Sequence, residues 1–151
     1  MIQCYYGTGK GKTTAAIGQA IRLAGANKRV LFIQFLKDGN SSEIKMLERC
    51  GIKVLFKKMP QMFVDMQLFD MIDESYDAIV LDEILDVITL SLINEGKVYD
   101  LLVKMKDSHE IILTGRMPSH KIKPILDYSS EIKKHKHPYD LGIQARHGIE
   151  Y

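Results

Sequence analysis

The chain has 151 residues, of which 46% are hydrophobic and 26% are charged, and its net charge is +2. These values are typical of globular proteins and exclude a disordered or fibrous chain, and the length suits a single domain, 1–151. So small a net charge gives no reason to expect nucleic acid or a membrane as a partner. The N-terminus, MIQCYYG, lacks a basic segment followed by an apolar one, and no apolar run reaches the roughly 20 residues of a membrane span. We therefore expect a cytoplasmic protein.

The first half of the chain alternates between apolar strands and amphipathic helices. Short apolar runs predict strands at 1–6, 29–36 and 52–56. Residues 13–24 predict a helix, because apolar side chains recur there at spacings of three and four. The polar run 40–43 offers a helix cap, with the helix extending to about residue 50.

The second half continues the same alternation. We expect strands at 78–81 and 110–113, both of which are strongly apolar. Helices are expected at 63–74, after residue 81 as far as 92, at 96–106 and, as a short piece, at 118–126. After residue 126 the pattern fades into a basic tail. Strands alternating with helices predict an α/β fold in which a mostly parallel sheet is flanked by helices. Ligands bind such sheets at the carboxyl ends of the strands.

The segment after the first strand, GTGKGKTT, is typical of a phosphate-binding loop. Gly7, Gly9 and Gly11 allow a tight turn whose N–H groups point inward, and the N-terminus of the following helix adds its dipole. Lys12 would reach phosphate oxygens, and Thr13 would offer a hydroxyl to Mg²⁺. The loop is one residue shorter than the usual G-x-x-x-x-G-K-[ST] pattern, and a flexible Gly/Lys turn is the simpler alternative.

Polar residues also lie at or near the carboxyl ends of three other predicted strands. Asp82 and Glu83 end the run AIVLDE, where carboxylates serve Mg²⁺ in phosphate-loop proteins or merely suit a helix dipole. Arg116, in LTGR, can reach a phosphate or can be a solvated surface charge. Gln34, in the second strand, either pairs with a neighbour or faces the site. The combination predicts a P-loop NTPase-like (RecA-type) three-layer sandwich that forms a single nucleotide-binding domain.

Several segments in order along the chain resemble one family. They are GTGKGKTTAAIGQAIRLAG, VLFIQFLK, VLDE, LTGR and KHPYDLGIQARHGIEY. This set is similar to the ATP:corrinoid adenosyltransferases of the phosphate-loop type, whose own loop has the same short form. The resemblance implies transfer of the 5′-deoxyadenosyl group from MgATP to the cobalt(I) of a reduced corrinoid, with release of triphosphate. It also implies a homodimer, an electron-donating reductase, and ATP bound in the reverse sense, with the ribose exposed to attack.

The resemblance carries roles to particular residues of this chain. It implies Lys12, Thr13 and Glu83 as the catalytic residues, and Thr13, Asp82 and Glu83 as the Mg²⁺ site. The closing tail would pack near the nucleotide and the corrinoid. The nucleotide contacts that it implies are Gly7, Thr8, Gly9, Lys10, Gly11, Lys12, Thr13, Thr14, Arg22 and Arg116.

The chain departs from the family pattern most clearly in 38–77, which is short and has no tryptophan. Family members have aromatic residues there that help displace the lower ligand of cobalt. Phe63 is the nearest candidate for a corrinoid contact, although it could equally belong to a helix core. The alternatives are an ATP-binding or ATP-hydrolysing relative that has lost corrinoid transfer through this shortened region, and a corrinoid carrier or sensor. Thr8 and Arg146 replace the usual Asn and Gln.

Overall fold

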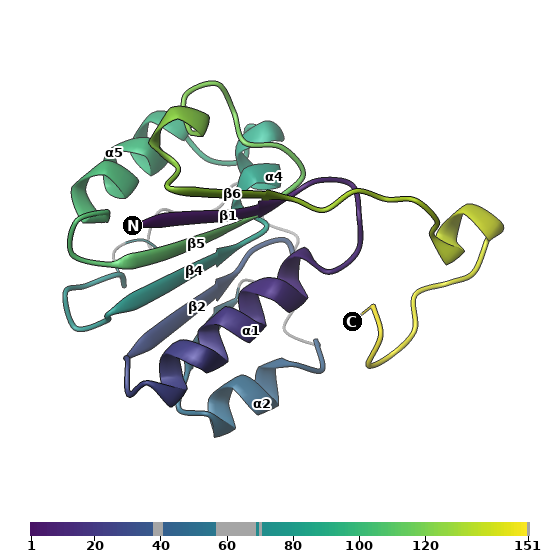
Figure 1. Cartoon of the computed structure of the whole chain (residues 1–151), viewed down its shortest axis with the longest axis horizontal. Helices are drawn as coiled ribbons and strands as arrows, with labels where there is room; N and C mark the ends of the chain where they lie inside the picture. Colours follow the sequence, from purple (N-terminus) through teal and green to yellow (C-terminus); the bar gives the residue numbers. More distant parts are fainter. Residues whose placement is uncertain (38–40, 57–68, 70, 151) are drawn as a thin grey trace.

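The structure is a computed structural model that describes residues 1–37, 41–56, 69 and 71–150. In this part of the chain, six strands form one sheet in the order β3-β2-β4-β5-β1-β6, and each pair of neighbours is parallel (Figure 1). The strands are β1 (Ile2–Tyr6), β2 (Val30–Gln34), β3 (Lys53–Phe56), β4 (Ala78–Asp82), β5 (Glu110–Gly115) and β6 (Tyr128–Glu131). The helices are α1 (Lys12–Gly25), α2 (Ile44–Arg49), α4 (Ile84–Thr89) and α5 (Glu95–Met105), with 3-10 turns η1 (Lys123–Ile125) and η2 (Pro138–Leu141).

Helices cover both faces of the sheet. Side chains of a strand alternate between its faces, so Val30 and Phe32 of β2 pack in one apolar cluster with α1 and α2. Leu31 and Ile33 pack in the other cluster, with α4 and α5. Figure 1 shows the two pairs of helices on opposite sides of the sheet. The predicted three-layer α/β arrangement, of the P-loop NTPase-like kind, is confirmed.

Two predictions in the second half are wrong. Instead of a helix at 118–126, the structure has only the short turn η1, within which Pro124 lacks the N–H that a longer helix needs. The structure also has a strand that the sequence did not indicate, β6, which pairs with β1 at the edge of the sheet. All four residues of β6 are exposed, so it has neither the apolar run nor the alternation by which strands are recognised.

The expected helix at 63–74 falls largely outside the described residues, and so does Phe63. Phe69, which is described, is buried and stacks on Phe35 with ring centroids 6.0 Å apart. Within the described ranges, no helix combines the length and apolar character that a bilayer span requires. The carboxyl ends of β1, β2, β4 and β5 meet at one edge of the sheet, and this edge carries the polar residues that the sequence singled out.

Candidate active site

The loop between β1 and α1 is held in place by its backbone. Gly7 and Gly11 have φ angles of 122° and 115°, which side chains with a Cβ rarely adopt. The Gly7 N–H donates to the carbonyl of Arg116 at 2.9 Å, and the Gly9 N–H donates to the carbonyl of Ile132 at 2.8 Å. The loop is thus braced by the ends of β5 and β6. The Lys12 ammonium curls back over it and donates to the Gly9 carbonyl at 3.1 Å.

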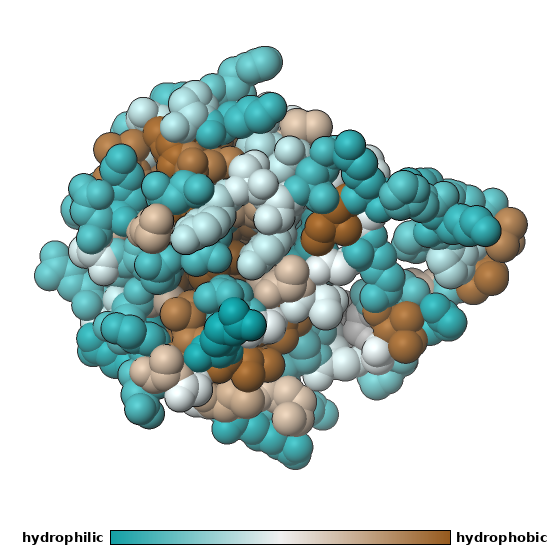
Figure 2. Space-filling model, in the orientation of Figure 1, coloured by the Kyte–Doolittle hydropathy of each residue, from teal (hydrophilic) through white to brown (hydrophobic). Residues whose placement is uncertain are grey.

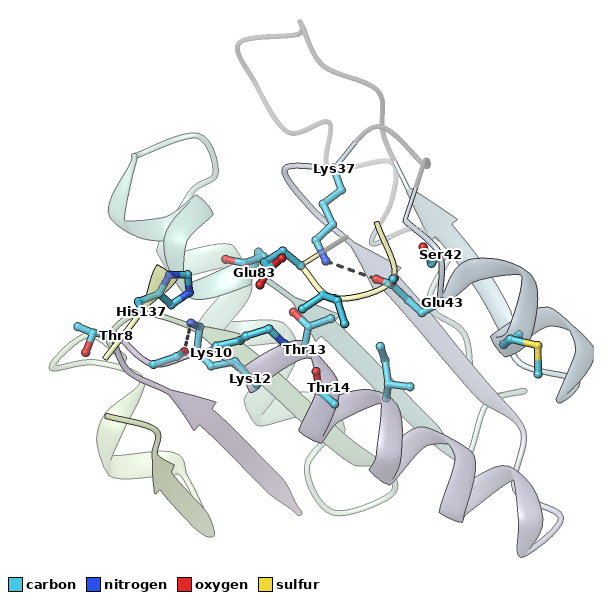
Figure 3. Close-up of a pocket in the computed structure, with 17 residues that line it drawn as sticks. Thr8, Lys10, Lys12, Thr13, Thr14, Lys37, Ser42, Glu43, Glu83 and His137 are labelled. Carbon is cyan, nitrogen blue, oxygen red and sulfur yellow. Dashed lines mark hydrogen bonds and ion pairs between the residues drawn. The ribbon is translucent and has the colours of Figure 1, made fainter. Parts of the chain in front are cut away.

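A pocket of about 610 Å³ opens above this loop (Figure 3). Its floor is the phosphate loop and the first turns of α1, and its walls come from the segment after β2, from α2, from Glu83 and from the tail. Outside the phosphate loop, the lining residues are Ile17, Lys37, Ser42, Glu43, Met46, Glu83, His137, Gly148, Ile149 and Glu150. The predicted residues Thr8, Gly9, Lys10, Gly11, Lys12, Thr13 and Thr14 all line it. Lysine and hydroxyl side chains therefore meet in a cavity large enough for a small molecule.

Asp82 lies behind this pocket and organises its back wall. Its carboxylate is fully buried, and its Oδ1 accepts hydrogen bonds from the hydroxyls of Thr13 at 2.9 Å and Thr114 at 2.7 Å. The Thr114 hydroxyl in turn accepts a bond from the Glu83 N–H at 2.8 Å. The ends of β4 and β5 and the start of α1 are thereby tied to one carboxylate, which fixes the position of the Thr13 hydroxyl.

Glu83 differs from its neighbour because it lines the pocket itself. Its φ of 66° is left-handed, an uncommon conformation for a residue other than glycine. Burial raises the pKa of its carboxyl to about 7, and a hydrogen bond with Asp86 and the charges of Asp82 and Asp86 act in the same direction. The charge of Lys12 opposes the rise in this pKa. A cation bound beside Glu83 would favour its ionised form.

The arrangement fits a magnesium ion that arrives with phosphate. Among the described residues, no group of three or more His, Cys, Asp or Glu side chains is placed to hold a metal unaided. Mg²⁺ needs no such cage, because it usually binds one or two carboxylates together with substrate phosphates and water. The Thr13 hydroxyl and the Glu83 carboxyl supply that kind of donor on the pocket wall, with Asp82 directly behind them.

Three predicted nucleotide contacts do not line this pocket: Gly7, whose backbone braces the loop, and the two arginines Arg22 and Arg116. Arg22 is exposed on α1, and the Arg116 side chain is 81% exposed, with its Nε 3.9 Å from Asp86 Oδ1. Neither is among the described residues that line the pocket. Through its backbone, however, Arg116 accepts the hydrogen bond from Gly7.

The structure also adds residues that the sequence did not assign to the site. Gln34 is buried and donates to Glu43 Oε1 at 2.9 Å, so it pairs with a neighbour. Glu43, expected to be part of a helix cap, stands at the N-cap of α2 but directs its carboxylate to Gln34 and Lys37 instead. The signals for Lys37 in the sequence are its place just after the second strand and its position at the end of the segment VLFIQFLK. The contact of Glu43 depends on tertiary packing, which the spacing of residues does not reveal.

Comparison with known proteins agrees with this geometry. The sequence model of the family described as "ATP:corrinoid adenosyltransferase BtuR/CobO/CobP" matches residues 1–71 and 65–151. The chain belongs to this family. It is 31% identical to the corrinoid adenosyltransferase of Escherichia coli (strain K12) and 30% identical to the corrinoid adenosyltransferase CobA of Salmonella typhimurium. Each of these alignments covers 100% of this chain and 85% of the relative. A corrinoid adenosyltransferase of Sinorhizobium sp. is 26% identical, over 96% of this chain and 77% of that protein.

The match identifies the chain as a transferase of the ATP:corrinoid adenosyltransferase family, for which ATP and a corrinoid are the substrates. The alignments with the E. coli and S. typhimurium proteins extend over 169 positions, so these relatives have residues without a counterpart in this chain. The two segments of this chain that match the family model overlap at 65–71. This overlap lies inside the stretch 38–77, which is expected from the sequence to be shorter than in other family members.

Proposed function

We propose that this adenosyltransferase moves the 5′-deoxyadenosyl group of MgATP to the cobalt(I) of a reduced corrinoid and releases triphosphate. The observation that supports this most strongly is the pocket itself, where a short phosphate loop, Lys12, Thr13 and Glu83 surround one space at the sheet edge. In the transfer, cobalt(I) gives its electron pair to the 5′ carbon of the ribose. The cobalt–carbon bond forms as the carbon–oxygen bond breaks, and the bonding pair of that bond leaves with triphosphate. No proton has to be removed from cobalt.

The protein's part is to bind and neutralise the leaving group. The N–H groups of the loop between Gly7 and Thr14, with Thr8 and the ammonium groups of Lys10 and Lys12, would hold the triphosphate oxygens. Thr13 and Glu83 would hold Mg²⁺, with Asp82 positioning Thr13 from behind. Mg²⁺, when bound, would supply positive charge to the departing triphosphate.

Other roles rest on the family resemblance. We propose Arg22 and Arg116 as further nucleotide contacts and Phe63 as a corrinoid contact. We also propose a cytoplasmic homodimer that receives electrons from a reductase. Exposed apolar side chains on the tail, such as Leu141 and Ile143, offer surface for contact between subunits (Figure 2). The single-domain organisation over 1–151 is likewise proposed.

The decisive experiment combines the protein, MgATP and a chemically reduced corrinoid under anaerobic conditions. We expect loss of the cobalt(I) absorbance, with one triphosphate released for each adenosyl–cobalt bond formed. Orthophosphate release without an adenosyl–cobalt product would contradict the proposal, and would instead favour an ATP-hydrolysing relative whose short region 38–77 no longer supports transfer.

Two matched lysine variants sharpen this test. Lys12→Ala removes an ammonium from the loop and should lower kcat/KM for ATP by at least about a hundredfold, because leaving-group charge is then less stabilised. Lys45→Ala removes the same charge from the exposed side of α2 and should leave kcat/KM close to that of the unaltered protein. Equal rates for the two variants would mean that the triphosphate lies elsewhere.

A further inference from the structure

Lys37 connects two carboxylates from different parts of the fold. Its Nζ lies 3.3 Å from Asp82 Oδ2, at the end of β4. It also lies 3.5 Å from Glu43 Oε1, at the N-terminus of α2, a contact that Figure 3 shows. The side chain is 27% exposed and lines the pocket, so its ammonium borders the space proposed for triphosphate. Glu43 is held in turn by the hydrogen bond from Gln34.

The backbone before Lys37 directs this side chain back over the sheet edge. The Phe35 N–H donates to the Asp82 carbonyl at 3.1 Å, which keeps the chain beside β4 after β2 has ended. Leu36 then has a φ of 55°, a left-handed conformation that is unusual for leucine. Strained backbone of this kind persists where the surrounding structure enforces it, and it is concentrated at functional sites. Glu83 has the same kind of φ at the end of the neighbouring strand.

The carboxylate of Asp82 requires a cation. A fully buried carboxylate is strongly disfavoured unless an opposite charge lies near it, and the hydroxyls of Thr13 and Thr114 carry no net charge. Lys37 supplies the charge in this structure. A divalent cation held by Thr13 and Glu83 would approach the same carboxylate. Two cations beside one carboxylate repel each other, so binding of the metal should weaken the contact between Lys37 and Asp82.

We propose that Lys37 is an exchangeable counter-cation. It neutralises Asp82 while the pocket holds no nucleotide, and it moves to the triphosphate when Mg²⁺ and ATP bind, with Glu43 as its tether. Lysine suits this task because its ammonium is a compact charge on a flexible stem with three donors. The inference rests on the proposed triphosphate and Mg²⁺ site, and it adds a substrate-binding residue to it.

The test measures two affinities of the complete protein for Lys37→Gln. We measure Mn²⁺ binding without nucleotide by electron paramagnetic resonance. The affinity of Lys37→Gln for Mn²⁺ should be about tenfold tighter than that of the unaltered protein, because the competing ammonium is gone. We measure binding of inorganic tripolyphosphate at saturating Mg²⁺ by calorimetry. This binding should be about tenfold weaker in Lys37→Gln, because a phosphate-binding cation is lost. Lys37→Arg restores the charge and should return both affinities to within about threefold of the unaltered protein.

Opposite shifts of the two affinities distinguish exchange from a structural role of Lys37, since a distorted pocket would weaken the binding of both Mn²⁺ and tripolyphosphate. Lys45→Gln, on the exposed side of α2, is the matched control and should change neither affinity. An unchanged or weaker Mn²⁺ affinity in Lys37→Gln overturns the proposal, and so does an unchanged tripolyphosphate affinity. Neither measurement uses a corrinoid, so the opposite shifts would stand even if the protein failed to form an adenosyl–cobalt product.

Discussion

Asp82 and Glu83 are adjacent carboxylates with opposite environments. Asp82 points into the fold, where Lys37 neutralises its charge and hydroxyl groups donate hydrogen bonds to it. The left-handed backbone of Glu83 turns its side chain to the pocket, where burial, aided by the nearby carboxylates of Asp82 and Asp86, raises its pKa to about 7. The sequence predicted both as magnesium ligands because they follow a buried strand. It could not predict that one stands behind the pocket and the other lines it, since the residue pattern does not reveal where the strand ends or that Glu83 has a left-handed backbone.

The raised pKa of Glu83 predicts a pH-dependent stability. Between the ordinary pKa of 4.5 and about 7, the folded protein binds a proton at Glu83 that the unfolded chain has lost. The free energy of unfolding, measured without Mg²⁺ or nucleotide, should therefore fall as pH rises through this window, by about 3 kcal/mol for this group. Glu83→Gln should remove that fall and should be more stable than the unaltered protein at pH 8.

Urea denaturation at several pH values measures this effect. Glu48→Gln, on the exposed side of α2, serves as the control and should keep the fall in stability. The carboxyls of Asp73, Asp77 and Glu150 have lowered pKa values, so their contributions change at more acidic pH and do not overlap the window. If the free energy of unfolding falls with pH as steeply in Glu83→Gln as in the unaltered protein, Glu83 is already ionised at pH 5.

At the scale of elements, the phosphate loop and strand β6 depend on each other. The sequence predicted the loop, because its glycines and lysines form a known local pattern. It did not predict β6, whose role arises only from pairing, since Ile132 immediately after it both accepts from the Gly9 N–H and donates to the Tyr6 carbonyl. A strand of exposed polar residues is thus what closes the back of the loop. Such a strand is invisible to hydrophobic periodicity.

Gly7→Ala tests this dependence. A Cβ at residue 7 would lie 2.4 Å from the Ile132 carbonyl oxygen, and the φ of 122° is itself unfavourable for alanine. We expect the free energy of unfolding, measured by urea denaturation, to fall by about 2–4 kcal/mol. Gly11→Ala has a similar φ but no atom within 4 Å of the new Cβ, so it should lose only about 1–2 kcal/mol.

Gly18→Ala completes the series as a control inside α1. Its Cβ would also meet nothing within 4 Å, and alanine favours a helix interior over glycine, so a gain of about 0.5–1 kcal/mol is expected. If Gly7→Ala and Gly11→Ala lose equal stability, backbone strain alone accounts for the loss and contact with Ile132 contributes nothing.

At the scale of the whole molecule, the chain divides into a packed body and a tail, 135–150. The buried apolar side chains of the described residues all lie between Ile2 and Ile122, and none of the tail residues is buried. The body was largely predictable, because parallel strands and amphipathic helices impose strong patterns. The course of the tail was not, because it follows from scattered contacts such as that between Ser42 Oγ and His147 Nε2 at 3.1 Å. In Figure 1 the tail leaves the body and then turns back, and residues 148–150 line the pocket together with residues of α1 and α2.

This division predicts that the tail serves ligand binding more than folding. A chain that ends at Lys134 keeps the core and Ile132 but loses His137, Gly148, Ile149 and Glu150 from the pocket wall. Its free energy of unfolding without ligand should change by less than about 1 kcal/mol, because no buried apolar surface is removed.

The affinity of the shortened chain for MgATP, measured by calorimetry, should fall about tenfold, equivalent to about 1.4 kcal/mol. Tyr139→Ser in the complete chain, at a tail position that is 75% exposed and outside the pocket lining, should leave that affinity unchanged. Undiminished MgATP binding by the shortened chain would show that the tail does not cover the nucleotide, while a large loss of stability would show that it supports the fold.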